Sequence, residues 1–416
     1  MNALASKDLQ GEAFSVESLA PEFRLAAACS RWPQNEGDRA DIERIATEND
    51  IDWSLFGRIV ERNQILSLAK RNLGDALSKT GQCDIFGPAK AVGYATKCLS
   101  QAAELVRIGD AAKEGGLEVI ALKGVVLSVV AYGHLALRSP GDIDLLVDPA
   151  NVLDLERVLL KLGYIRYEPG ARLTPKRLTH YLKYYKHFAY FSETRNIALE
   201  VHWRLFHNNH LTQPDLQRSK TIQVPIGSGV VSTLSRPELV LYLCVHGAIH
   251  GWPVLKWLAD IGALLRSMTE DDLREVVSLA SERGLTSQLQ AMMLLVDHFL
   301  AIDHPSIDIP RTNAAVVKRI VSMAHRLLTG NDYCLAIDDF PRFGMFLYDI
   351  GIGPSWRYRV EDIRRALVFP DDWERLDLPD SLFPLYVAVR PVSWMMRHLS
   401  RVPKRLFGMN HRPLSS

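Results

Sequence analysis

Residues 119–147 constrain the fold more than any other part of the chain. The segment opens with a short apolar run, turns at Lys123-Gly124 and continues into a compact apolar stretch. It closes on a second run in which Asp142 and Asp144 alternate with apolar residues. Alternation with a period of two is typical of a half-buried strand, so the segment predicts a strand, a helix and a second strand. On that second strand the two carboxylates share one face.

A third carboxylate lies on another predicted strand, residues 196–204, where Glu200 and His202 occupy the polar face. Asp142 and Asp144 repel each other and lose solvation, so a cation is expected between them, and their hard oxygen ligands favour Mg²⁺. Removing one of these two carboxylates is expected to relieve the repulsion. Two metal ions on such a platform can hold both oxygens of an in-line phosphoryl displacement. Taken singly, each carboxylate also fits a solvated strand end, and His202 fits an acceptor-site base or a structural histidine.

Three motifs together resemble a known family. The Leu-Lys-Gly turn at 122–124, the Arg-x-x-Gly-Asp-Ile-Asp motif at 138–147 and the Glu-x-His-Trp strand at 199–203 are similar to a branch of uncharacterised nucleotidyltransferases. That branch belongs to the polymerase-beta-like nucleotidyltransferase superfamily, and the resemblance covers about residues 119–266. It implies an α+β fold, in which a polymerase-beta-like nucleotidyltransferase core, a small mixed sheet with helices, is joined to helical N-terminal and C-terminal regions.

The resemblance also implies an activity. A Mg²⁺-dependent nucleotidyltransferase moves a nucleoside monophosphate from a triphosphate to a hydroxyl-bearing acceptor and releases pyrophosphate. Asp142 and Asp144 are then expected to hold both Mg²⁺ ions, and Glu200 the ion nearer the acceptor. Glu200 or Asp142 would help to remove the acceptor's proton. ATP, and hence AMP, is the default by abundance, whereas the acceptor stays open among a small molecule, a peptide, a protein hydroxyl and an RNA end.

Two rival functions use the same residues. A phosphotransferase (kinase) would move a different phosphoryl group on the same metal platform and release ADP instead of pyrophosphate. A catalytically silent nucleotide-binding module would keep the fold without the reaction. The intact trio of Asp142, Asp144 and Glu200 argues against the silent module, because a dead site usually loses a ligand.

Four residues are candidates for binding nucleotide phosphates. Lys123 and Gly124 replace the Gly-Ser of the wider superfamily, at a strand end where a helix N-terminus favours anions. The alternative for Lys123 is a lysine that merely ends a strand with its charge in water. Arg138 would pair with the triphosphate or with Asp142. The resemblance adds Lys256 as a phosphate contact from the helical domain.

Two histidines are predicted to line the cleft opposite the sheet. His246 and His250 are four residues apart on a predicted helix and therefore share a face. A zinc site would need further ligands, and none is apparent in the sequence. For Asp260, which follows on the next predicted helix, structural hydrogen bonding between helices is the stronger interpretation.

The chain divides into four predicted segments. Ser235 and Glu238 form a predicted capping box at the start of the third segment. The nucleotide is expected between this segment and the sheet, because ligands collect between domains. The segments are a helical N-terminal region (1–115), the nucleotidyltransferase core (116–231), a helical domain (232–330) and a Pro-interrupted helical extension (331–416).

Composition and hydropathy argue against several other classes of protein. Lys plus Arg number 49 and Asp plus Glu 48, so there is no global charge signal for nucleic acid. No apolar run reaches membrane-spanning length, and the N-terminus lacks the pattern of a signal peptide. Five scattered cysteines suit a reducing compartment, so a cytoplasmic location is expected. The basic, aromatic stretch 382–406 fits a helix at a membrane surface or a terminal helix packed on the domain.

Overall fold

The computed structural model describes residues 18–80, 86–208, 220–305, 308–333, 342–353 and 355–399. Within these residues the chain forms a mixed α/β structure around a seven-stranded sheet with the order β3–β4–β5–β2–β1–β7–β6. The strands are β1 (Val119–Ala121), β2 (Ile143–Val147), β3 (Ile165–Glu168), β4 (His187–Ser192), β5 (Ile197–His202), β6 (Thr221–Ile226) and β7 (Gly229–Leu234).

The sheet is mixed, as the sequence predicts. β2 runs parallel to β5, and β1 runs parallel to β7, whereas the other neighbouring strands are antiparallel. The hairpin β6–β7 joins the sheet through β1, where Ala121 faces Thr233 and the Thr233 hydroxyl donates to the Ala121 carbonyl. The hairpin thereby extends the mixed sheet beyond β1.

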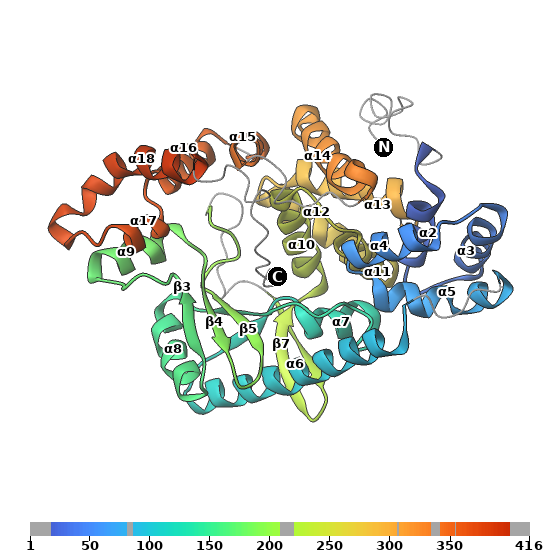
Figure 1. Ribbon diagram of the computed structural model, residues 1–416, viewed down its shortest axis with the longest axis horizontal. Coiled ribbons are helices and arrows are strands. Elements are labelled where there is room, and N and C mark those ends of the chain that lie inside the picture. The colour runs from blue at the N-terminus through green and yellow to red at the C-terminus, as the bar shows by residue number, and fades with distance from the viewer. Residues whose placement is uncertain are drawn as a thin grey trace.

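Helices cover both faces of the sheet (Figure 1). Those before and within the sheet region are α2 (Pro21–Cys29), α3 (Glu36–Glu48), α4 (Trp53–Arg62), α5 (Leu66–Thr80), α6 (Pro88–Glu114), α7 (Gly124–Tyr132), α8 (Val152–Lys161) and α9 (Pro175–Tyr184). Those that follow it are α10 (Arg236–His250), α11 (Leu255–Ser267), α12 (Glu270–Glu282), α13 (Thr286–Leu300), α14 (Ala314–Tyr333), α15 (Arg342–Ile352), α16 (Trp356–Leu367), α17 (Pro370–Arg375) and α18 (Tyr386–Leu399). Among these described helices, none is both long and apolar enough to cross a bilayer.

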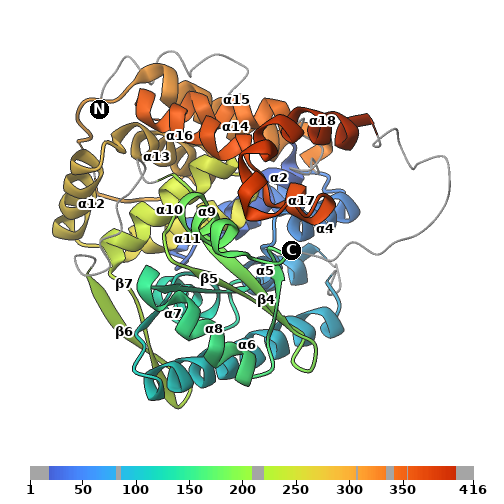
Figure 2. The ribbon, with the colours of Figure 1, turned by 90° about the vertical axis from the view of Figure 1, so that its left-hand side faces the viewer.

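The two faces of the sheet belong to different hydrophobic cores. Leu145 and Val147 of β2 pack with α6 and α8 on one face, whereas Leu146 faces the core that contains α10 and α11. Figures 1 and 2 show this arrangement from two directions, with α6 and α8 on one side of the strands and α10 and α11 on the other. The alternation read from the sequence therefore separates a fully apolar face from the face that carries the carboxylates.

The N-terminal helices α2 to α5 share a core with α10 to α14. Phe23 of α2 contacts Phe299 of α13 edge to face, with ring centroids 5.9 Å apart, and Arg266 of α11 pairs with Asp38 of α3. The later helix α6 instead packs its apolar side on the sheet. The division into four segments stays a prediction, but the packing joins the first helices to the third segment.

The capping box predicted at Ser235 and Glu238 is wrong. Ser235 does stand before the first turn of α10, but its hydroxyl makes no capping hydrogen bond and has no partner among the residues that the structure describes. Glu238 instead accepts two hydrogen bonds from Arg283, at 2.7 and 2.6 Å. The charge-assisted pair with a guanidinium outcompetes the weaker contact to a backbone N–H.

The prolines of the C-terminal extension do not all end helices, since Pro391 lies inside α18. The extension returns to the sheet region, where the Arg177 guanidinium of α9 donates to the Leu378 carbonyl and to the Tyr386 hydroxyl. Part of the predicted basic segment, residues 400–406, lies outside the described residues, as do Cys83 and Cys334. The three described cysteines, Cys29, Cys98 and Cys244, are free and buried.

Candidate active site

The turn after β1 brings the chain close to the carboxylates. The Leu122 N–H donates to the Asp144 carbonyl at 3.0 Å, and Lys123 is the residue before the first turn of α7. Gly124 has a φ of +66°, and a Cβ at this position would lie 3.2 Å from the Asp142 carbonyl oxygen. Both the backbone angle and the close approach therefore require a glycine after the lysine.

The strand register gathers the carboxylates on one face. Asp144 of β2 lies directly opposite Glu200 of β5, and His202 lies opposite His187 of β4. Residues opposite each other on neighbouring strands project from the same face, so these four side chains meet above the sheet. Asp142 immediately precedes β2 and is partly exposed.

Asp144 has two cationic or donor partners. Its Oδ1 lies 3.1 Å from Lys123 Nζ and 3.3 Å from His202 Nε2, and the residue is only 5% exposed. Burial opposes ionisation of this carboxyl, but Lys123 and His202 outweigh it and hold its pKa below the usual range. Burial likewise opposes the charge of Lys123, but Asp144, Tyr242 and Glu200 raise the pKa of the lysine above its ordinary value. The two groups therefore form a buried ion pair.

Asp142 is the carboxylate without a partner. It makes no hydrogen bond or ion pair with any of the described residues. Burial and the charges of Asp144 and Glu200 raise its pKa above the ordinary value. The negative charge on Asp142 is thus not balanced by a paired cation from the described residues. Carboxylate oxygens are the donors that Mg²⁺ prefers. The residues present at this position fit a divalent cation.

Glu200 belongs to the tightest group of ligand-type side chains among the described residues. The ligand atoms of His187, Glu200 and His202 all lie within 4.8 Å of one another. Asp142, Asp144 and Glu200 are not gathered as closely, so the group that the structure assembles shares only Glu200 with the predicted metal trio. Burial opposes ionisation of Glu200, but His202 and His187 hold its pKa below the usual range.

Arg138 forms a buried ion pair with Asp260. Its Nε lies 3.1 and 3.0 Å from the two carboxylate oxygens of Asp260, and the Tyr132 hydroxyl donates to the same carboxylate at 2.9 Å. All three residues are buried. Arg138 therefore pairs with Asp260 and not with Asp142, the partner that the sequence offered as an alternative. Asp260 takes the structural role expected for it and joins α11 to the loop after α7.

Lys256 lies on α11, nearly buried, and its Nζ donates to the side chain of Gln64. Burial and the nearby Arg138 lower the pKa of Lys256 to about 7, although Asp260 acts in the opposite direction. Gln64 has a φ of +56°, and its carbonyl accepts a hydrogen bond from the Ser139 hydroxyl at 2.6 Å. The loop between α4 and α5 thus reaches the site from the N-terminal region.

His246 and His250 share a face of α10, with ring centroids 4.7 Å apart. Burial lowers the pKa of His250 to about 3, and it holds that of His246 well below its ordinary value. Trp257 packs against both rings. Burial therefore disfavours the charged form of both imidazoles, which are largely enclosed.

Sequence reasoning missed four residues of this neighbourhood. Lys186 is partly buried, makes no ion pair among the described residues, and has a pKa lowered by burial and by Lys123 while Glu200 opposes the shift. Tyr242 of α10 is buried and hydrogen-bonded to Lys123. Gln64 and His187 complete the set. Only His187 carried a signal, because the sequence predicts a strand at residues 187–191. The register that sets it opposite His202 could not be predicted.

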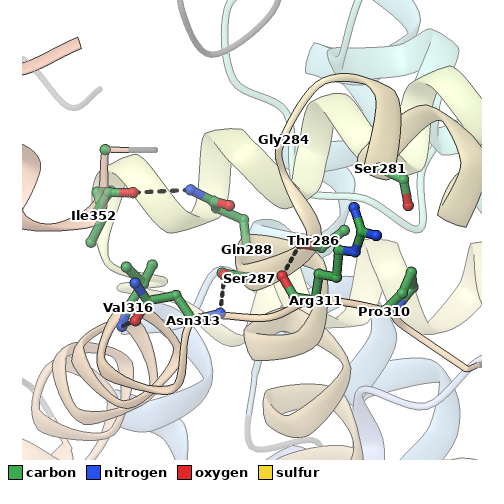
Figure 3. Close-up of a pocket in the computed structure, with 11 residues that line it drawn as sticks. Ser281, Gly284, Thr286, Ser287, Gln288, Pro310, Arg311, Asn313, Val316 and Ile352 are labelled. Carbon is green, nitrogen blue, oxygen red and sulfur yellow. Dashed lines mark hydrogen bonds between the residues drawn. The ribbon is translucent and has the colours of Figure 1, made fainter. Parts of the chain in front are cut away.

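A separate pocket of about 600 Å³ lies away from these carboxylates (Figure 3). It opens between the end of α12, the first turns of α13 and α14, and Ile352. The Gln288 amide at its edge donates to the Ile352 carbonyl at 3.0 Å, and Asn313 N–H donates to the Ser287 hydroxyl at 2.8 Å. The lining includes none of the predicted site residues.

Comparison with curated proteins finds no match for the chain. The model of a family described as uncharacterised nucleotidyltransferase matches residues 49–301. This range includes the whole sheet, the carboxylates, and helices α10 and α11 that face them. Because the match covers more than half of the chain, the protein belongs to this family of uncharacterised nucleotidyltransferases.

Proposed function

We propose that the protein transfers a nucleoside monophosphate from a nucleoside triphosphate to a hydroxyl group, with Mg²⁺ bound at Asp142, Asp144 and Glu200. The observation that carries the proposal is the register of two parallel strands, which sets Asp144 opposite Glu200 with the unpaired Asp142 beside them. When bound, Mg²⁺ would supply charge stabilisation for the reacting phosphate oxygens. The family match supports the general reaction.

Two lysines are proposed to bind the outer phosphates. Lys123 and Lys256 come from two different elements, the turn before α7 and helix α11. Their charges would neutralise the pyrophosphate as it leaves, which is how proteins promote phosphoryl transfer without covalent chemistry. Arg138 is proposed to act on this site through its buried pair with Asp260, which fixes α11 relative to the loop after α7.

The proposed reaction is an in-line displacement at the α-phosphorus of the triphosphate. The acceptor oxygen forms a bond to the α-phosphorus, the bond between that phosphorus and the bridging oxygen breaks, and pyrophosphate leaves with the electron pair. The acceptor's proton passes to Asp142 or Glu200. ATP is the donor proposed first, and the acceptor is any hydroxyl-bearing small molecule, peptide or protein that reaches the carboxylates.

Product analysis tests the proposal. The full chain is incubated with each common nucleoside triphosphate, Mg²⁺ and a panel of hydroxyl-bearing acceptors, and the products are measured by mass spectrometry. Pyrophosphate together with an acceptor heavier by one nucleoside monophosphate is the expected result. Release of a nucleoside diphosphate with a phosphorylated acceptor would identify a kinase and overturn the proposal. The Asp142→Asn variant should form neither product.

A further inference from the structure

Two histidines and a glutamate form a compact ligand set that the carboxylate platform does not require. His202 Nε2 lies 3.0 Å from Glu200 Oε2, and His187 Nδ1 lies 3.8 Å from the same oxygen. Neighbouring ligand atoms of a tetrahedral zinc site are about 3.3 Å apart, given Zn–N and Zn–O distances of about 2.0–2.1 Å. The observed separations bracket that value, so small side-chain adjustments would suffice for metal binding.

Unpaired imidazole nitrogens in this ligand set favour a bound metal ion. His187 Nδ1 is buried and has no hydrogen-bond partner among the described residues, although it lies 3.8 Å from Glu200 Oε2. Within the described parts of the chain His202 Nδ1 also has none, and the polar contacts of this imidazole are made by Nε2, with Asp144 and Glu200. Buried polar atoms without partners are rare, and a metal ion would satisfy the His187 nitrogen.

Rigid strands hold the three side chains. His187 and His202 are directly opposite each other on the antiparallel pair β4–β5, and Glu200 lies two residues before His202 on the same face. Sites built on strands keep their geometry better than sites on loops. Glu200 retains 24% exposure and His187 12%, which leaves a route for an ion from solvent.

The ligand types select a class of metal. Imidazole nitrogen suits Zn²⁺, Ni²⁺, Cu²⁺ and Fe²⁺, whereas Mg²⁺ takes oxygen ligands and keeps several waters. Two imidazoles with one carboxylate form a three-ligand set that leaves further positions open. We propose that His187, Glu200 and His202 bind one divalent first-row transition-metal ion in preference to Mg²⁺. This site shares Glu200 with the proposed nucleotide site but needs no nucleotide.

Cobalt absorption tests the proposal without any assay of activity. The full chain is stripped of metal and titrated with Co²⁺, whose visible bands report nitrogen and oxygen ligands. One equivalent of Co²⁺ should bind, Zn²⁺ should displace it, and a large excess of Mg²⁺ should not. His187→Gln and Glu200→Gln should each weaken binding by at least about tenfold, since losing even a second-shell partner costs about 10–100-fold in affinity.

His207→Gln is the matched control. His207 is the neighbouring imidazole, with its ring centroid 6.4 Å from that of His187, and it lies outside the ligand set. Its variant should bind Co²⁺ like the wild type. The wild-type melting temperature should rise with Zn²⁺, and the His187→Gln melting temperature should not, which separates lost binding from lost folding.

Three results would overturn the proposal: no visible Co²⁺ bands in the wild type, displacement by Mg²⁺ as easily as by Zn²⁺, or an equal loss in His207→Gln. Each would leave His187 and His202 as positioning residues for Glu200. Failure of nucleotide binding with intact Co²⁺ binding would count against the proposed function alone. Intact Mg²⁺-dependent nucleotide binding with no Co²⁺ site would count against this inference alone.

Discussion

Lys123 Nζ lies 3.1 Å from Oδ1 of Asp144, so the lysine proposed to bind phosphate neutralises a carboxylate proposed to bind metal. The carboxylate side chain is 6% exposed and that of the lysine 16%, which shields the pair from solvent. Under the proposed function, Asp144 would hold Mg²⁺ in place of this ammonium, and Lys123 would then be free to contact the triphosphate.

Asp144 and Asp142 should differ in their effect on stability. Asp144→Asn leaves the buried ammonium of Lys123 without its ion pair, which should cost about 3–5 kcal/mol of unfolding free energy. For Asp144, the lost ion pair should therefore outweigh the expected relief of repulsion among the carboxylates. Asp142→Asn should leave stability unchanged or raise it, because Asp142 has no partner and its neighbours are negative. Urea denaturation at neutral pH measures both, and equal losses would contradict the ion-pair account.

Lys123→Met should weaken binding of nucleoside triphosphates by about ten- to a hundredfold, because a charged hydrogen bond to phosphate contributes about 1.5–3 kcal/mol. Nucleoside monophosphate affinity should change much less, since the proposed contact is to the outer phosphates. Calorimetry with both ligands makes the comparison. Tighter triphosphate binding in the variant would mean that Lys123 only competes with metal for Asp144.

Tyr132→Phe should lower the free energy of unfolding by about 1.5–3 kcal/mol, because it removes a hydrogen bond to the buried carboxylate of Asp260. Asp260→Asn should cost more, since it leaves the buried Arg138 guanidinium without its ion pair. Tyr167→Phe is the control, because that tyrosine is 53% exposed. A Tyr132→Phe protein as stable as the control would show that the hydroxyl contributes nothing to this network.

Lys256 should take up a proton when a triphosphate binds. Burial lowers its pKa to about 7. In the free protein, the lysine is therefore mostly neutral at a pH about one unit above that value. Phosphate would raise that pKa, and uptake should approach one proton. Calorimetry in two buffers of different ionisation enthalpy measures the uptake, and Lys256→Met should abolish it. Unchanged uptake in that variant would assign the proton to another group.

The lowered pKa of Lys256 should also make the free energy of unfolding rise with pH. Its pKa is lowered from 10.5 to about 7, so the unfolded chain binds more protons than the folded one between these values. The cost of a buried ammonium is therefore fully present below pH 7 and disappears as the pH rises toward 10.5. Lys256→Met should gain stability at the acid end of that range relative to wild type, as denaturation at two pH values would measure.

Local patterns predicted much of the sheet and part of the site. The alternation around Asp144 and around Glu200 identified both strands and the face that their carboxylates share. Their direct opposition depends on a parallel pairing between segments more than fifty residues apart, and no local pattern encodes that register. His187 was on a predicted strand, but its antiparallel register with His202 was equally hidden.

Contacts across the chain account for the rest. Arg138 was placed near the site from its motif, yet its partner Asp260 is 122 residues away and could not be chosen from sequence. Gln64 reaches Lys256 from the N-terminal helices through a backbone angle that non-glycine residues seldom adopt. Such contacts depend on how the helical regions pack, which the separate hydrophobic patterns of each helix leave undetermined.

Mg²⁺-dependent binding of a nucleoside triphosphate tests the central claim most directly. Non-hydrolysable analogues of the four common triphosphates are titrated calorimetrically into the wild type and into Asp142→Asn, with and without Mg²⁺. Asp142→Asn is the informative variant because it should remain folded. The account predicts that at least one analogue binds the wild type only with Mg²⁺ and binds Asp142→Asn at least about tenfold more weakly, a loss of about 1.4 kcal/mol or more. Equal affinity in both proteins, or binding that does not depend on Mg²⁺, would contradict it.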